Sequence, residues 1–180
     1  RKGRGEGWLM KAPKEPRPLY GLDLLAKRPD ERVWIVEGEK CADALRGIGL
    51  LAVTSQGGSK AASKTDWKPL AGRAVTIWPD NDEPGRVYLT SVSRVLRDVG
   101  ASSVDIIDVT AAGCTGEGDD CADWIVHNST FTPSEMCILV ESLLREKRGG
   151  VNVHNSTFTP TKKTEDGVNV RNSTFTPVAG

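Results

Sequence analysis

The sequence has no long apolar run. Its longest uncharged apolar stretches, such as residues 33–36 and 47–54, are only a few residues long, whereas a helix that crosses a bilayer needs about 20 predominantly apolar residues. The chain begins with Arg-Lys-Gly-Arg, which includes neither an initiator methionine nor an apolar signal segment. We therefore expect no contact with a membrane, and we interpret the chain as a piece of a longer polypeptide.

The sequence is also poor in side chains that form zinc sites or disulfides. It has two histidines and four cysteines, at positions 41, 114, 121 and 137, and no two cysteines are spaced Cys-x-x-Cys. A structural zinc site is therefore not expected. Four cysteines in 180 residues are too sparse for a disulfide framework, which favours a reducing, cytoplasmic location.

Three common functional motifs are missing. The chain has no Gly-x-x-x-x-Gly-Lys-Ser/Thr loop, which argues against a helicase motor, and no Gly-x-Gly-x-x-Gly segment after a predicted strand, which leaves a dinucleotide fold unsupported. It also lacks the nucleophile elbow of serine hydrolases.

The net charge is zero, yet basic and acidic residues are unevenly distributed. Residues 1–30 have eight basic and four acidic side chains, residues 31–146 have eleven and eighteen, and residues 147–180 have five and two. An acidic body thus lies between two basic ends. Zero net charge does not exclude a nucleic-acid partner, because basic ends supply a weak, salt-sensitive affinity for the phosphate backbone.

The body alternates short β-branched runs with helical patterns. Strands are predicted at residues 33–36, 51–54, 74–78 and 104–109, and helices at residues 40–46, 85–99 and 134–145. Thr132, Pro133 and Glu135 have the spacing of a capping box at the start of the last helix, and Gly100 is placed to end the preceding one. Strands separated by helices predict an α/β fold with a parallel sheet of about four strands flanked by helices.

We divide the chain into three parts. Residues 1–30 are a basic, Pro- and Gly-rich lead-in from the end of an upstream region, and residues 19–25 in it are expected to form a turn and a short helix that docks on the body. Residues 31–146 form the folded domain. Residues 147–180 form a flexible tail.

The tail repeats a segment of the domain. Residues 127–133 (His-Asn-Ser-Thr-Phe-Thr-Pro) recur identically at 154–160 and, with the first residue changed, at 171–177. The unequal spacing of the copies excludes a solenoid. The copies are either a duplicated mobile segment or a binding motif presented several times for avidity.

Acidic side chains follow the first and third predicted strands. Glu37 comes directly after the first, and Asp80 and Asp82 come after the third. The carboxyl ends of neighbouring parallel strands meet at one edge of a sheet, so these carboxylates would converge there. Close carboxylates repel unless a cation lies between them, and hard oxygen ligands select Mg²⁺ or Mn²⁺. The alternative is that they cap helices and interact with helix dipoles.

A third acidic segment follows the fourth predicted strand. It includes Asp120 and Asp123, which are candidates for holding a second ion. The alternative is a solvated loop that caps a helix over residues 124–126.

Basic side chains flank the predicted site: Lys40, Lys60, Lys64, Arg73 and Arg86. A carboxylate cluster with Mg²⁺ suits phosphoryl transfer, and these cations are candidates for holding a triphosphate or a template backbone. Lys60 and Lys64 lie in a Gly-rich loop whose backbone amides can also face phosphate. Ordinary solvation at the surface is the alternative for each of them.

Together these motifs resemble the Toprim domain of bacterial-type primases, topoisomerases and several nucleases. The resemblance is carried by residues 37–43 (Glu-Gly-Glu-Lys-Cys-Ala-Asp) and 80–85 (Asp-Asn-Asp-Glu-Pro-Gly), and it covers roughly residues 17–146. Residues 52–58 and 65–73 make the surroundings similar to the primase-like replication proteins of phages and mobile elements. The resemblance implies a Rossmann-like Toprim domain over residues 31–146.

The resemblance also implies an activity and site roles. The activity would be Mg²⁺-dependent nucleotidyl transfer that makes RNA primers on single-stranded DNA from nucleoside triphosphates, with a replicative helicase as a candidate partner. Glu37 would act as general acid/base or as a metal ligand, Asp80 and Asp82 would bind Mg²⁺, and Asp120 and Asp123 would hold further metal. Primases usually place one residue between the last two aspartates, and here there are two.

Two other functions stay open at this point. A Toprim nuclease would use the same metal ligands with water as the nucleophile. A non-catalytic module would bind nucleic acid or a replisome partner.

Overall fold

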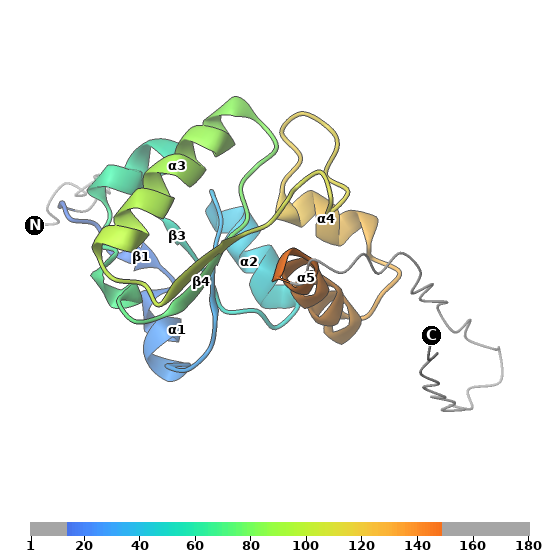
Figure 1. Ribbon diagram of the computed structural model, residues 1–180, viewed down its shortest axis with the longest axis horizontal. Coiled ribbons are helices and arrows are strands. Elements are labelled where there is room, and N and C mark those ends of the chain that lie inside the picture. The colour runs from blue at the N-terminus through green and yellow to red at the C-terminus, as the bar shows by residue number, and fades with distance from the viewer. Residues whose placement is uncertain (1–13, 149–180) are drawn as a thin grey trace, which may run out of the picture. The chain divides into compact units, whose positions relative to one another are not determined.

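A five-stranded sheet forms the centre of the described part of the chain, residues 14–148 of the computed structural model (Figure 1). Its strands are β1 (Leu19–Tyr20), β2 (Val33–Ile35), β3 (Ala52–Ser55), β4 (Ala74–Ile77) and β5 (Ser103–Ile106). The order is β1-β3-β2-β4-β5, in which β2 to β5 are parallel and β1 is antiparallel to β3. The predicted α/β class is confirmed, but the sheet is mixed rather than wholly parallel, because a strand of the lead-in pairs with β3.

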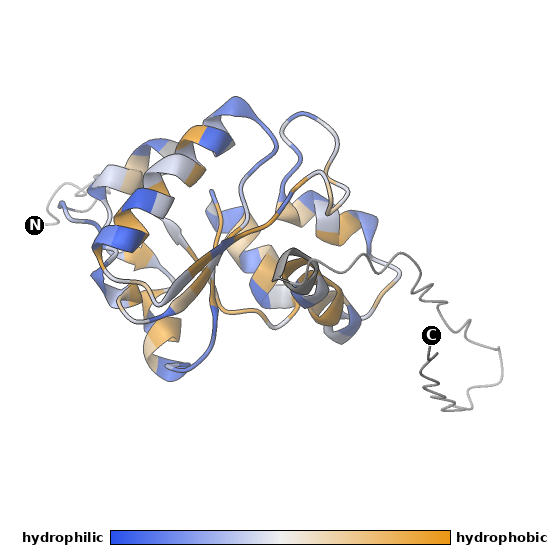
Figure 2. Cartoon of the chain, in the orientation of Figure 1, coloured by the Kyte–Doolittle hydropathy of each residue, from blue (hydrophilic) through white to orange (hydrophobic). Residues whose placement is uncertain are grey.

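Helices cover both faces of the sheet. They are α1 (Leu22–Lys27), α2 (Glu39–Gly47), α3 (Glu83–Asp98), α4 (Cys121–His127) and α5 (Pro133–Arg148), with 3-10 helices η1 (Ser59–Lys64) and η2 (Lys68–Leu70). Their apolar sides face the strands (Figure 2). No helix within residues 14–148 is long and apolar enough to cross a membrane.

Alternation along the strands divides the core into two clusters. In β2, Trp34 packs in the cluster that includes residues of α2, α4 and α5, whereas Val33 and Ile35 pack in the cluster that includes residues of α1 and α3. All three side chains are buried. A strand that is buried on both faces reads as a continuous apolar run, which is why the sequence predicted β2 well.

The ends of the long helices follow the predicted local chemistry. The Gly100 N–H donates to the Arg97 carbonyl over 3.1 Å, and the Ala101 N–H donates to the Leu96 carbonyl over 3.0 Å. With Gly100 at φ 80°, this is the paired C-terminal arrangement that favours glycine. At α5, the Glu135 carboxylate accepts a hydrogen bond from the Thr132 N–H over 2.7 Å, which confirms the predicted cap.

Part of the lead-in belongs to the folded unit. Leu19 and Leu25 are buried in the core cluster of α1 and α3. The Arg46 guanidinium donates to the Ala52 carbonyl through Nη2 over 2.7 Å and to the Tyr20 carbonyl over 3.2 Å, which joins α2, β3 and β1. The helix predicted over residues 19–25 is found at α1, after a two-residue strand.

Some elements differ in extent from the predictions. The Gly-rich loop predicted around Lys60 and Lys64 contains η1. The fourth predicted strand is shorter and begins one residue earlier, as β5. The tail copies of the repeat, at 154–160 and 171–177, lie outside the described residues.

Candidate functional site

The predicted convergence of acidic residues depends on whether β2 and β4 are neighbours. They are paired in parallel, with Val33 opposite Val75 and Ile35 opposite Ile77. The Trp78 N–H continues the ladder by donating to the Ile35 carbonyl over 2.9 Å. The chain segments that follow these strands therefore leave the sheet at the same edge, here called the acidic edge, where Glu37, Asp80 and Asp82 are found.

Two hydroxyl groups hold the turn that presents Glu37. The Thr54 hydroxyl donates to the carbonyl of Val36 over 2.6 Å, and the Tyr88 hydroxyl donates to the same oxygen over 3.2 Å. Both side chains are buried. The end of β2 is thus fixed from β3 on one side and from α3 on the other, immediately before Glu37.

Asp80 is the electrostatic centre of this edge. Burial raises its pKa from the usual 3.8 to about 7, and the negative charges of Glu37, Asp120 and Asp82 add to the effect in that order. The charge of Lys40 acts in the opposite direction. The carboxylates of all three acidic segments therefore make ionisation of Asp80 less favourable.

Gly85 brings α3 against the backbone of Asp80. A Cβ atom at position 85 would lie 2.3 Å from the Asp80 carbonyl oxygen, which is far inside van der Waals contact. The Asp82 carboxylate caps the same helix by accepting a hydrogen bond from the Gly85 N–H over 2.6 Å. One oxygen of Asp82 thus has the capping role that was the structural alternative to metal binding.

The third acidic segment caps α4. The Asp120 Oδ1 atom accepts hydrogen bonds from the backbone N–H groups of Ala122 and Asp123, over 2.7 and 3.0 Å. Asp123 Oδ2 accepts in return from the Asp120 N–H over 3.1 Å. The capping alternative is therefore present in the structure, with a helix over Cys121–His127.

The second oxygen of Asp120 faces the acidic edge. Asp120 Oδ2 lies 2.8 Å from Lys40 Nζ. Burial favours a higher pKa for Asp120, but hydrogen bonds from Lys40 and from the backbone of Asp123 outweigh it and lower the pKa. Asp120 thus stays ionised beside an Asp80 whose pKa is raised.

Asn81 joins two of the acidic segments, which the sequence did not reveal. Its side-chain amide donates to the carbonyls of Cys114 and Gly116 over 3.1 and 2.8 Å. Its backbone N–H donates to the Asp119 carbonyl over 2.9 Å, and its carbonyl accepts from the Gly118 N–H over 3.0 Å. Four hydrogen bonds therefore hold the loop after β4 against the loop before α4. The only sequence signal was the position of Asn81 between two aspartates.

The predicted basic residues are dispersed. Lys60 lies exposed on η1, and Lys64 lies 3.5 Å from Glu15. Arg86 lies on the first turn of α3 and pairs with Glu83 over 2.8 Å. Among residues 14–148, Lys40 is the one of these five that forms an ion pair with a candidate metal ligand, Asp120.

Arg73 does not flank the acidic edge as predicted. It directly precedes β4, so it lies at the opposite edge of the parallel strands. Its guanidinium donates to the carbonyls of Leu25, Arg28 and Glu31 over 3.3, 2.6 and 2.9 Å. Arg73 therefore ties α1 and the following loop to the sheet.

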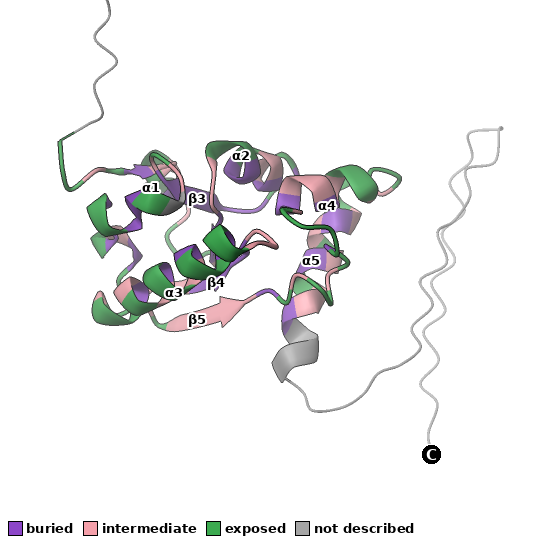
Figure 3. Ribbon diagram, turned by 90° about the horizontal axis from the view of Figure 1, so that it is seen from above, coloured by how far each residue is buried: buried purple, intermediate pink, exposed green. Residues whose placement is uncertain are grey.

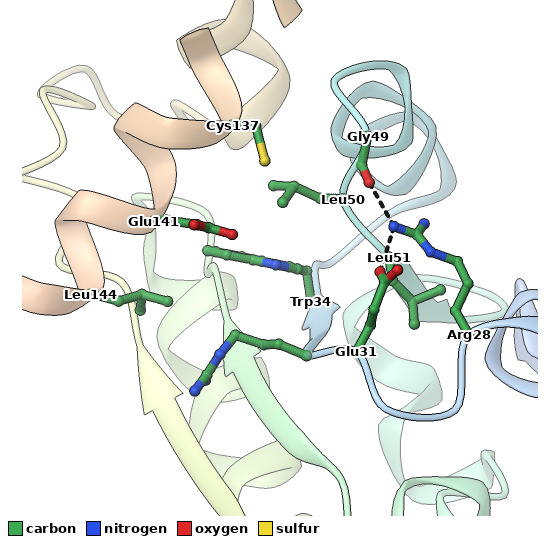
Figure 4. A pocket seen from close by; sticks show the side chains of 10 residues that line it. Arg28, Glu31, Trp34, Gly49, Leu50, Leu51, Cys137, Glu141 and Leu144 are labelled. Carbon is green, nitrogen blue, oxygen red and sulfur yellow. Dashed lines mark hydrogen bonds and ion pairs between the residues drawn. The ribbon is translucent and has the colours of Figure 1, made fainter. Parts of the chain in front are cut away.

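A cavity of about 400 Å³ also lies at that opposite edge (Figure 4). It lies between the starts of β2 and β3 and the helix α5. The lining includes Trp34, Leu50, Leu51, Cys137, Glu141 and Leu144. This cavity is separated by the length of the strands from the acidic edge, so it is no part of the candidate site.

The acidic edge suits a hard divalent cation in donor chemistry and in charge. All of its candidate ligands are carboxylates, and their mutual repulsion contributes to the raised pKa of Asp80. Within residues 14–148, no three Asp, Glu, His or Cys side chains are gathered into a ready-made metal-binding group. The candidate ligands are therefore neighbours whose side chains would have to turn toward a shared ion.

Comparison of the chain with protein-family models, with curated proteins and with solved structures found no match. The function is accordingly inferred from the residues and geometry of the acidic edge, together with the sequence resemblance described above.

Proposed function

We propose that this chain is the Toprim catalytic module of a DNA primase-like replication protein, which joins ribonucleotides into RNA primers on single-stranded DNA. The observation that supports it best is the pairing of β2 with β4, since it brings Glu37, Asp80 and Asp82 to one edge. This is the arrangement that the motifs of the sequence imply for Mg²⁺-dependent phosphoryl transfer.

The residues of the acidic edge would have different roles in the reaction. Glu37, Asp80 and Asp82 would hold Mg²⁺ or Mn²⁺, with Asp120 and Asp123 beside them for a further ion. When bound, the metal would neutralise negative charge at the reacting phosphate. Glu37 would accept a proton from the attacking hydroxyl, and the ammonium group of Lys40 would bind phosphate oxygens.

The remaining parts of the proposal concern partners and location. Single-stranded DNA and nucleoside triphosphates would be the substrates, a replicative helicase would be a partner, and the protein would work in the cytoplasm without a membrane. Lys60, Lys64 and Arg86 would contribute to the path of the phosphate backbone. Arg73 is left out of that path, because its guanidinium holds three backbone carbonyls at the far edge.

The test is primer synthesis by the full-length parent protein on single-stranded DNA. The double variant Asp80→Asn/Asp82→Asn keeps the side-chain shapes and should lose synthesis. Asp98→Asn removes one exposed carboxylate at the far end of α3 and should keep it. Primer synthesis that survives the double substitution overturns the metal assignment. If the wild type instead nicks DNA in a metal-dependent way and makes no primers, the nuclease function is assigned.

A further inference from the structure

The two partners of the ion pair between Lys40 and Asp120 differ in their exposure to solvent. The side chain of Lys40 is 67% exposed, whereas that of Asp120 is 11% exposed. Two backbone N–H groups of α4 also hold the Asp120 carboxylate. Lys40 is therefore the partner that can leave at little cost, while Asp120 stays in place.

The charge of Lys40 also interacts with other groups of the acidic edge. Its hydrogen bond to Asp120 is the main cause that raises its pKa, and the charge of Asp123 acts in the same direction. In return, the charge of Lys40 lowers the pKa of Asp80. One exposed ammonium group thus offsets part of the charge of three carboxylates.

We propose that Lys40 is an internal counter-cation of the acidic edge: its ammonium group takes the place beside Asp120 that a divalent cation would take, and it moves to a substrate phosphate when the metal binds. This inference rests on the proposed function, since it assumes a metal at the acidic edge. It assigns Lys40 two successive contacts, first a carboxylate and then a phosphate.

The position of Lys40 fits both contacts. It is the second residue of α2 and lies three residues after Glu37, at the edge where β2 ends. A flexible four-carbon stem lets its ammonium group exchange one oxygen ligand for another. Two of the other predicted cations pair with carboxylates that are not candidate metal ligands: Arg86 with Glu83 on its own helix, and Lys64 with Glu15.

The experiment measures binding of Mn²⁺ alone to the 180-residue chain by electron paramagnetic resonance, for the wild type, Lys40→Met and Lys68→Met. Lys40→Met, which lacks the internal cation, should bind Mn²⁺ about two- to fivefold more tightly than the wild type. This factor in affinity corresponds to the free energy that an exposed ion pair typically contributes. Lys68→Met removes the same charge from an exposed lysine on η2 and should leave the affinity unchanged.

A second measurement follows inorganic tripolyphosphate in the presence of saturating Mn²⁺. Lys40→Met should bind it several-fold more weakly than the wild type, although it binds the metal more tightly. Opposite changes in the two affinities are not expected of a residue with a merely structural role. Thermal unfolding of the three proteins checks that each is folded.

Each outcome has a distinct meaning. Equal or weaker Mn²⁺ binding by Lys40→Met overturns the counter-cation, and so does an equal gain in Lys68→Met. Tighter Mn²⁺ binding with unchanged tripolyphosphate binding overturns the transfer to phosphate. Absence of Mn²⁺ binding in the wild type overturns the proposed function itself.

Discussion

Gly85 packs directly on the backbone of Asp80, and the position has no room for a side chain. An added Cβ would lie 2.3 Å from the Asp80 carbonyl oxygen and 3.0 Å from its backbone nitrogen and carbonyl carbon. The glycine is needed here for close approach rather than for a left-handed backbone. It sets how near the first turn of α3 comes to the carboxylate with the raised pKa.

The variant Gly85→Ala should be destabilised by about 1–3 kcal/mol, since backbone atoms must move to admit the methyl group. Urea unfolding measures this change. Gly47→Ala is the matched control, because no atom lies within 4 Å of a Cβ placed there on α2, and alanine favours a helix. A stable Gly85→Ala variant would show that the approach of α3 to Asp80 is loose.

Replacing Asn81 should loosen the loop before α4. Asn81→Ala loses two side-chain hydrogen bonds, to the carbonyls of Cys114 and Gly116. We expect a loss of about 1–3 kcal/mol in stability and faster amide exchange in residues 114–119, measured by mass spectrometry. In Asn128→Ala, which loses a bond to Trp124 in α4, exchange in that loop should be unchanged. Equal exchange in both variants would contradict the role of Asn81.

The raised pKa of Asp80 makes stability depend on pH. Because its folded-state pKa is about 7 and the usual value is 3.8, the folded state binds the proton more tightly than the unfolded state does. The stability contributed by Asp80 therefore falls as pH rises from about 4 to about 7. The difference in unfolding free energy between wild type and Asp80→Asn should follow this course in urea titrations.

The same urea titrations can be repeated with added Mg²⁺. If the cation binds ionised Asp80, it should stabilise the wild type more at pH 8 than at pH 6, because protons compete with it at the lower pH. In Asp80→Asn this difference should be much smaller. An equal effect of Mg²⁺ on both proteins at both pH values would remove Asp80 from the metal site.

The lead-in should detach when Arg46 is shortened. Arg46→Ala loses the bonds to the carbonyls of Ala52 and Tyr20, and charged donors to such groups contribute about 1.5–3 kcal/mol each. We expect a clear loss of stability and faster tryptic cleavage after Lys27; Arg28 precedes Pro29, so trypsin does not cut there. Arg86→Ala, which loses one exposed ion pair, should behave like the wild type. Unchanged cleavage in Arg46→Ala would mean that β1 is held by its strand pairing alone.

The sequence could predict the parts of the fold that carry a strong local signal. The run at β2 and the caps of α3 and α5 depend on neighbouring residues, and all of them are found. The pairing of β2 with β4 was a condition of the predicted site, and the structure meets it.

Other features depend on contacts distant in the sequence. β1 has two residues, too few for any periodicity, and it exists because β3 offers an edge. Asn81 binds carbonyl groups more than 30 residues away in the chain, and no neighbouring residue indicates that contact. Arg73 is a different case. It directly precedes β4, so its place at the far edge of the sheet could have been predicted from its position in the sequence.

The outer strand β5 has a consequence for self-association. It is the last strand of the sheet within residues 14–148, and all four of its residues are only half-buried (Figure 3). Strands at the edge of a sheet are the places where a strand of another molecule most readily adds. Asp105, which pairs with Arg32, lies within this strand, and charged side chains are one of the means by which edge strands disfavour such pairing. The same two charges that link β5 to β2 therefore also discourage fibre-like growth from this side.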